Sequence, residues 1–541
     1  MATASAARAS IWIASGTLLS RVLGLARSMV LVAAIGATGF ATNAFGTASQ
    51  VTNVVYTLVA TGVLTSVLVP QLTRARLRPG GGADYVNKLI TLALCGSLAV
   101  CAVVAALLPT LMGWLGTHWT EPGQLALATG FAFWLLPQIV FFTLYTVLGE
   151  VLNSRSLFGP YAWTPVLNNV VAIAGLAAFV IVVGADPDGE RTAAEWPEGG
   201  TALIAGSATL GVTLQAVALF FFLRRAGVSY RPDFKFRGTG LGATARLGGW
   251  TFLGVLVSQI VALALNQGMN RAAGGEAGIA AWQLASLVTV LPHSIIVMSL
   301  VTSRFTRMSV AAERGDTGAL RADLSLVARL TVVSITLMAV VIAVLAGPIT
   351  RILMASASVE RLYPVMAVLI CHVTGAVAFS VLFVLNRGFY AHSDTRSPFV
   401  IQAAIAVCSL VAIAGSLLLP SGAATAFITL ATNLLFWVQL GVTFVVLRRR
   451  LGGVGGRAIV RSWWQSAVAG AAAAAAGAWL LHVFGGIGVD SWALSGAGAA
   501  LATCAAVAAL MTTVYACCLL LVRNGEAGQT LGIIASRFRR A

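Results

Sequence analysis

The sequence consists largely of apolar blocks that are long enough to cross a lipid bilayer. A membrane-spanning helix needs about 20 predominantly apolar residues, and soluble domains carry about 25% charged residues. Here 58% of the 541 residues are hydrophobic and 9% are charged. The first block is too long for a cleaved signal peptide, so we expect it to remain as a helix. We therefore predict an all-α polytopic membrane protein with about 14 transmembrane helices, at residues 10–36, 44–69, 87–115, 124–150, 161–184, 201–223, 244–270, 279–303, 326–347, 364–390, 399–419, 424–447, 462–484 and 492–522.

Basic residues gather in alternate connections between these blocks. If the N-terminus is cytoplasmic, the inner segments hold clusters such as Arg74, Arg76 and Arg78, Arg448 to Arg450, and the tail Arg537, Arg539 and Arg540. The outer segments hold only Arg191, Arg271, Arg351 and Arg361, together with an acidic loop at 185–200. The positive-inside rule therefore predicts a multi-pass membrane protein with both termini in the cytoplasm. The same rule explains the net charge of +17 without a nucleic-acid partner.

Two short matches indicate an internal repeat. SRVLGLAR at 20–27 corresponds to SQIVALAL at 258–265, a shift of 238 residues. NSRSLFGPYAWTP at 153–165 corresponds to YAHSDTRSP at 390–398, a shift of 233 residues when the prolines are matched. Parallel repeats place a substrate path between the lobes, although chance similarity of two apolar sequences is the alternative. The prediction is two pseudo-symmetric six-helix lobes plus two C-terminal helices: an N-lobe at 1–223, a basic cytoplasmic connector at 224–243, a C-lobe at 244–447, and the last two helices with a basic tail at 448–541.

The sequence lacks the motifs of several enzyme and metal-binding classes. It has no Walker phosphate loop, and its seven cysteines and five histidines have no metal-ligand spacing. No connection is long enough to form a soluble catalytic domain. Within the apolar blocks the one candidate acid is Glu150, which is better explained as a solvated helix end. We therefore expect a transporter that is not an enzyme and that has no metal site and no cofactor.

The first block, at 10–36, carries Arg21 and Arg27 inside an apolar run. At about 1.5 Å per residue, Arg21 lies roughly 17 Å from the start of the run and Arg27 about 9 Å further. A guanidinium near the bilayer centre costs at least ~2.5–3.5 kcal/mol on insertion scales, so intramembrane arginines are by default functional. Ser20 shares a helix face with Arg27, and Ser28 shares one with Arg21. The pattern favours a site for pyrophosphate or carboxylate; the alternative is a structural arginine that caps carbonyls of a neighbouring helix.

Four segments together resemble one transporter family. They are SRVLGLAR at 20–27, TNAFGTASQVTNVV…ATGVLTSVLVPQL at 42–72, LNSRSLFGPYAWTPVLNNVV at 152–171 and GFYAHSDTRSP at 388–398. They resemble the MurJ family, also called MviN, of the superfamily that includes MATE multidrug exporters. The resemblance implies fourteen helices, two lobes around a cationic cavity, and two last helices that line a groove for a lipid tail. It also implies movement of lipid II, the undecaprenyl-pyrophosphate-linked disaccharide-pentapeptide, from the inner to the outer leaflet by alternating access.

This chain keeps only part of the family's pattern of charged residues. The first-helix arginines correspond to Arg21 and Arg27. The acid that usually follows the second arginine is Ser28, and the Asp of the family's T-D-A-F stretch is Asn43. The usual arginines of the second and eighth helices fall on Tyr56, Thr57 and Leu287. The expected substrate-binding residues are therefore Arg21, Arg27, Ser20, Ser28, Asn43, Asn53 and Arg271, the last contributing charge from the outer end of the seventh helix.

Three other functions compete with lipid II flipping. A flippase for another polyprenyl-pyrophosphate glycan would suit the altered cavity. A non-transporting scaffold of the cell-wall synthesis machinery would suit the lost arginines, but would leave the insertion cost of Arg21 and Arg27 without a function. A multidrug exporter ranks last, because such exporters generally need intramembrane carboxylates. The absence of acids at membrane depth in the second lobe also favours membrane potential over a sodium gradient as the driving force.

Overall fold

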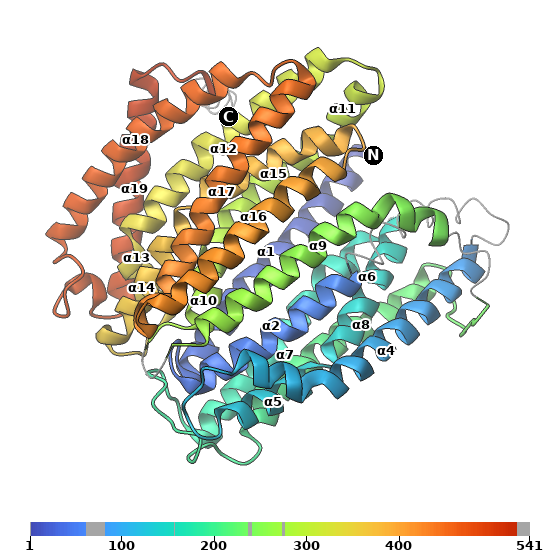
Figure 1. The fold of residues 1–541 in the computed structure, drawn as a ribbon, viewed down its shortest axis with the longest axis vertical. Coiled ribbons are helices and arrows are strands. Elements are labelled where there is room, and N and C mark those ends of the chain that lie inside the picture. Colours follow the sequence, from blue (N-terminus) through green and yellow to red (C-terminus); the bar gives the residue numbers. More distant parts are fainter. Residues whose placement is uncertain (1, 61–81, 156, 236–240, 273–275, 527–541) are drawn as a thin grey trace. The chain divides into compact units, whose positions relative to one another are not determined.

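The computed structural model describes residues 2–60, 82–155, 157–235, 241–272 and 276–526. Over these ranges every regular element is a helix, and the residues divide into two compact units, 1–280 and 281–541 (Figure 1). The prediction of an all-α membrane protein is confirmed. Thirteen helical segments of the described residues are long and apolar enough to span a membrane.

The helices of the first unit follow the predicted blocks closely. They are α1 (Ala2–Ile35), α2 (Phe40–Val59), α4 (Ala83–Leu115), α5 (Gln124–Leu135), α6 (Gln138–Ser154), α7 (Phe158–Val183), the π-helical turn η3 (Ala202–Gly206), α8 (Ser207–Arg225) and α9 (Leu241–Met269). The predicted block at 44–69 begins in α2, but its part from 61 to 69 lies outside the described residues, as do Arg74, Arg76 and Arg78 in the segment that follows. The described residues of α2 are not among the thirteen segments that are apolar enough to span a membrane, so the fourteenth span stays a prediction.

The second unit contains the remaining helices. They are α10 (Ile279–Pro292), η4 (His293–Val297), α11 (Met298–Glu313), α12 (Thr317–Val344), α13 (Ala346–Leu353), α14 (Val359–Val373), α15 (Ala376–Ala391), α16 (Arg396–Gly415), η5 (Ser416–Leu418), α17 (Ser421–Leu451), α18 (Gly456–Val483), η6 (Trp492–Leu494) and α19 (Ala497–Leu521). The last two long helices, α18 and α19, pack side by side (Figure 1, red). The tail arginines Arg537, Arg539 and Arg540 lie outside the described residues.

The turn between α1 and α2 packs against the acidic loop at 185–200. Gly36 and Gly39 have φ of 81° and 112°, a region that side chains other than glycine rarely adopt. A Cβ on Gly36 would lie 2.8 Å from the backbone of Gly189, so the close approach also requires glycine. The hydroxyl of Thr42 donates to the carbonyl of Gly36 at 3.0 Å, and the N–H of Asp186 donates to the carbonyl of Ala33 at 3.2 Å. These contacts hold the C-terminal end of α1.

The described part of the basic connector lies against α4. The N–H of Arg231 donates to Oδ1 of Asn87 at 3.2 Å, and the N–H of Asp233 donates to the hydroxyl of Thr91 at 3.1 Å. The hydroxyl of Tyr230 also lies 3.0 Å from that of Thr91. Residues 226–235 are therefore part of the first unit, while 236–240 lie outside the described residues.

Candidate functional site

Helix α1, which carries Arg21 and Arg27, packs along α7 and leaves much of its surface uncovered. Leu18 and Val22 are 59% and 56% exposed, and only 17% of the most apolar stretch of Ser15–Ile35 is buried. A helix that is apolar all round and covered on one side is typical of a membrane span at a lipid-facing or cavity-facing position. The structure therefore presents α1 as a helix whose arginines are not enclosed by a packed core.

An amide hydrogen bond and a pair of stacked tryptophans join α1 to α7. Nδ2 of Asn169 donates to the backbone carbonyl of Ser20 at 2.9 Å and lies 3.4 Å from its hydroxyl. Further toward the N-terminal ends of both helices, the rings of Trp12 and Trp163 stack with centroids 4.5 Å apart. A Cβ on Gly16 would lie 2.7 Å from the Trp163 ring, which shows how closely the helices approach. The residue before Arg21 is therefore tied directly to α7.

Arg21 and Arg27 are both half-buried. No residue that the structure describes forms a hydrogen bond or ion pair with Arg27. Ser28 uses its hydroxyl within its own helix, donating to the carbonyl of Gly24 at 3.1 Å. A guanidinium has five donors and no acceptor, and its fork matches the oxygens of phosphate or carboxylate. Arg27 thus offers donors that this part of the chain leaves unused.

The two asparagines expected at the site lie in different environments on α2. Asn43 is 2% exposed, and its side chain packs so closely on Gly278 that a Cβ there would lie 2.4 Å from Oδ1. That Oδ1 accepts no hydrogen bond from the described residues. Asn53 is exposed. Arg271 follows the end of α9 and is half-buried. Whether these residues act together with α1 in binding stays a prediction.

A buried polar cluster between α2, α4 and the C-terminal end of α9 was not predicted from the sequence. The hydroxyl of Thr47 contacts Oδ1 of Asn266 at 3.2 Å and Oδ1 of Asn270 at 3.0 Å. Nδ2 of Asn270 donates to Oδ1 of Asn266 at 2.8 Å and to the carbonyl of Leu115 at 3.1 Å. All three polar side chains are at most 1% exposed. The sequence signal was the pair of asparagines four residues apart, which places both on one helix face.

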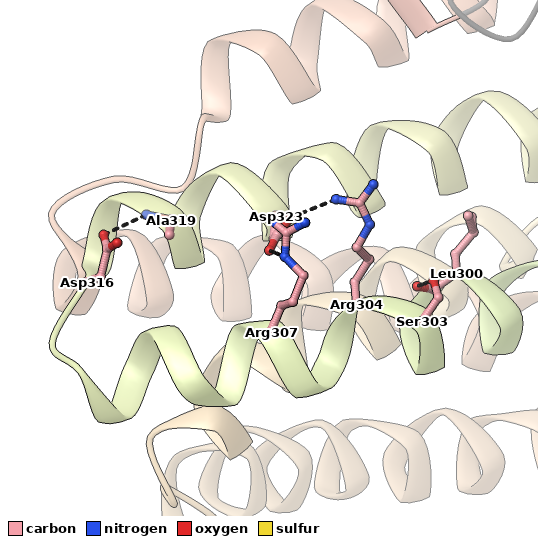
Figure 2. A network of polar contacts seen from close by, with 7 residues as sticks. All are labelled: Leu300, Ser303, Arg304, Arg307, Asp316, Ala319 and Asp323. Atoms are coloured by element: carbon pink, nitrogen blue, oxygen red, sulfur yellow. Dashed lines mark hydrogen bonds and ion pairs between the residues drawn. The ribbon is translucent and has the colours of Figure 1, made fainter. Parts of the chain in front are cut away.

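A second missed feature is a buried carboxylate in the second unit. Asp323, on α12, is 5% exposed. Its carboxylate forms ion pairs with Nη1 of Arg304 at 2.9 Å and with Nε of Arg307 at 3.3 Å, both from α11 (Figure 2). The hairpin between these helices is closed by Asp316, whose carboxylate caps α12 by accepting from the N–H of Ala319 at 2.9 Å. The predicted helix began at 326, so Asp323 was counted in a connection. The structure begins α12 at Thr317 instead.

Two histidines also find polar partners in the second unit. Nδ1 of His293 lies 3.0 Å from the hydroxyl of Ser380, and Nδ1 of His372 lies 2.9 Å from that of Thr289. Each pair joins the α10–η4 segment to α14 or α15. Among the described residues, no three His, Cys, Asp or Glu side chains are grouped as a metal site would require. The hydrogen bonds to hydroxyl groups therefore explain how these imidazoles are accommodated inside the protein.

Comparisons with known proteins agree with this architecture. The family model described as "Lipid II flippase MurJ" matches residues 31–495. A protein of Haemophilus influenzae described as "Probable lipid II flippase MurJ" is 28% identical over 417 residues, which are 71% of this chain and 75% of that protein. A "Lipid II flippase MurJ" of Burkholderia cenocepacia is 35% identical over 185 residues, 32% of this chain and 34% of that protein.

Solved structures show the same fold. A lipid II flippase MurJ in an inward closed conformation has a TM-score of 0.69 at 16% identity, covering 94% of this chain and 100% of that one. An inward-facing multidrug resistance MATE family transporter of the MOP superfamily has a TM-score of 0.63 at 15% identity, covering 82% of this chain and 98% of that one. The similarity to these two structures shows the fold and does not by itself choose between their families. The family model does, because the MurJ model matches residues 31–495 of the sequence. This chain therefore belongs to the lipid II flippase MurJ family.

Proposed function

We propose that this protein is a flippase that moves lipid II, the lipid-linked peptidoglycan precursor, from the inner to the outer leaflet of the bacterial cell membrane by alternating access. The observation that carries the proposal is the family match over residues 31–495. The chemistry of α1 agrees with it: a half-buried guanidinium without a described partner suits an anionic pyrophosphate better than a cationic drug. No catalytic step is needed for this activity.

The proposed substrate-binding residues are those expected from the sequence: Arg21, Arg27, Ser20, Ser28, Asn43, Asn53 and Arg271. Arg27 is the principal ligand of the pyrophosphate, because the described residues leave its donors unused. Asn169 acts as a positioning residue through its bond to the carbonyl of Ser20. Asn43 supplies a buried carbonyl oxygen that lacks a described donor and so suits an amide or hydroxyl of the substrate.

The proposal includes a topology and a domain organisation. Both termini lie in the cytoplasm, and residues 1–223 and 244–447 form the two six-helix lobes, joined by the basic connector at 224–243. Helices α18 and α19, within 448–541, lie outside the repeat. The positive-inside pattern of the arginines supports this orientation. Besides the lipid-linked substrate and membrane lipids, we expect proteins of cell-wall synthesis as partners.

Depletion of the protein in its host would test this function. We expect the amount of lipid II that an external probe can reach to fall on depletion and to return when the wild-type protein is restored. Total lipid II, measured in the same cells, should not fall. If lipid II still reaches the outer leaflet, the flippase reading for this substrate is wrong. Accumulation of another polyprenyl-linked glycan inside the cells would then identify the substrate. Such a substrate would be consistent with Tyr56, Thr57 and Leu287 at positions where the family usually has arginines.

A further inference from the structure

Arg387, on α15, is a further arginine inside a membrane-spanning segment, in a different unit from Arg27. Its guanidinium carbon lies 4.3 Å from the ring centroid of Phe383, 5.3 Å from that of Phe305 and 5.8 Å from that of Tyr390. Phe383 and Tyr390 belong to α15, one turn either side, and Phe305 comes from α11. Three aromatic rings therefore hold the cation in place, an arrangement that is favourable where water is scarce.

The rings leave the hydrogen-bonding capacity of this guanidinium unused. Arg387 forms no hydrogen bond or ion pair with any residue that the structure describes, and its Nε is buried without an acceptor. An aromatic face attracts a cation but does not replace an oxygen acceptor. A buried N–H in a native protein normally has a hydrogen-bond acceptor. The guanidinium of Arg387 therefore has donors that suit a group with oxygen acceptors.

Other arginines of the same unit do have carboxylate partners. On α11, Arg304 and Arg307 flank Phe305, and both are paired with the buried Asp323 (Figure 2). At the end of α17, Arg450 forms an ion pair with Asp394, which follows the end of α15. Asp323 and Asp394 are thus already engaged by other arginines. The local charge stays positive, with Arg387 as the cation that an added anion would neutralise.

We propose that Arg387 binds a phosphoryl oxyanion at this end of α15. The aromatic rings fix the position of the guanidinium, and its in-plane N–H groups form the fork that binds two phosphate oxygens. The cage is open on one side, because Tyr390 is 37% exposed. Two sources carry this group in a membrane: the headgroup of an anionic phospholipid and the diphosphate of a polyprenyl-linked precursor. The proposal concerns binding alone and does not depend on transport.

Binding by the full-length protein in nanodiscs of zwitterionic phosphatidylcholine tests the proposal. The probes are undecaprenyl diphosphate and, in a separate set of nanodiscs, phosphatidylglycerol, with bound lipid counted by native mass spectrometry. We expect Arg387→Met to weaken binding of at least one probe about tenfold or more, the value of a charge-assisted hydrogen bond. The affinity of Arg387→Lys should lie between those of the wild type and Arg387→Met, because lysine keeps the charge and lacks the guanidinium fork. Arg457→Met, which removes an exposed arginine at the start of α18, is the matched control.

The outcome also identifies the source of the phosphate. A loss confined to undecaprenyl diphosphate assigns the site to the precursor, and a loss confined to phosphatidylglycerol assigns it to the headgroup. Equal affinities in wild type, Arg387→Lys and every other folded variant would overturn the proposal. Thermal melting identifies the folded variants; if Arg387→Met fails to fold, Arg387→Lys alone decides. A failure of lipid II flipping in cells would leave this result standing, because binding is measured without transport.

Discussion

Arginines in two membrane-spanning regions of this protein differ in their partners. In the α11–α12 hairpin, Arg304 and Arg307 share the buried carboxylate of Asp323 (Figure 2). In α1, Arg27 has no described hydrogen bond or ion pair. The paired arginines belong to a hairpin within one unit, and their shared carboxylate offsets one of their two positive charges. Arg27 gains no hydrogen bond or ion pair from the described residues, so its donors are available to an anion.

The comparison separates structural from functional charge without reference to depth in the membrane. A carboxylate between two guanidiniums completes its own hydrogen bonding, and removing it leaves donors without acceptors. An arginine without a carboxylate retains its capacity for an external anion. The first kind of residue should therefore affect stability when changed, and the second kind should affect transport. Three variants test that division, in order of expected effect.

The largest effect is expected from Arg27→Ala. Loss of a charge-assisted contact with pyrophosphate, worth about 1.5–3 kcal/mol, should reduce flipping by about tenfold to a hundredfold. Arg27→Lys should retain part of the activity, because it keeps the charge but not the bidentate fork. The measurement is restoration of externally accessible lipid II in depleted cells, with protein abundance checked in the same membranes. Full restoration by Arg27→Ala would remove this residue from the site.

Asp323→Asn should affect stability more than transport per folded molecule. The amide cannot neutralise Arg304 and Arg307, so we expect a loss of about 1–3 kcal/mol, towards the lower value because the Arg307 side chain is 68% exposed. Thermal melting of the purified protein measures it. Asp316→Asn is the matched control, since asparagine caps a helix as well as aspartate does. Equal melting temperatures for the two variants would show that the buried pair contributes no stability.

The smallest effect is expected from Asn169→Leu. Its bond to the carbonyl of Ser20 is neutral, and that carbonyl keeps its helical hydrogen bond inside α1, so the loss should cost only about 1 kcal/mol of stability. Flipping should fall by more than stability does, because α1 loses its fixed position on α7. Thr164→Val on the same helix is the control: the Thr164 hydroxyl is buried without a described partner, so its removal should be neutral. If flipping falls only in proportion to the amount of folded protein in both variants, Asn169 has no positioning role.

Most of the helical framework could be predicted from the sequence because each block of about 20 apolar residues must form its own backbone hydrogen bonds in a bilayer. The predicted block 161–184 corresponds to α7, and 399–419 corresponds to α16 with η5. The start of α12 was wrong by nine residues, because the helix extends into a charged stretch where Asp316 caps it and Asp323 is paired. Hydropathy reports the apolar part of a helix and not its polar ends.

The partners of the charged and polar side chains could not be predicted in the same way. Arg387 lies beside the recognised segment 388–398, yet nothing in the sequence shows that Phe305, 82 positions earlier, contacts it. Thr47 and Asn270 are also far apart in the chain and meet only because α2 packs on α9. Contacts of this kind depend on helix packing, which a pattern of apolar residues leaves open.

The sequence by itself determined that the chain is a helical membrane protein of the MurJ family with two arginines in its first span. Hydrocarbon excludes unpaired backbone groups and penalises charge, so length and hydropathy indicate the helices and make the two arginines conspicuous. The family follows from the sequence motifs and from the family match over residues 31–495. Only the tertiary structure decided which arginines are neutralised. Arg304 meets Asp323 because the α11–α12 turn folds one helix onto the other, whereas the packing around Arg27 and Arg387 brings no carboxylate to either. Charge is a property of the residue, and its neutralisation is a property of the fold.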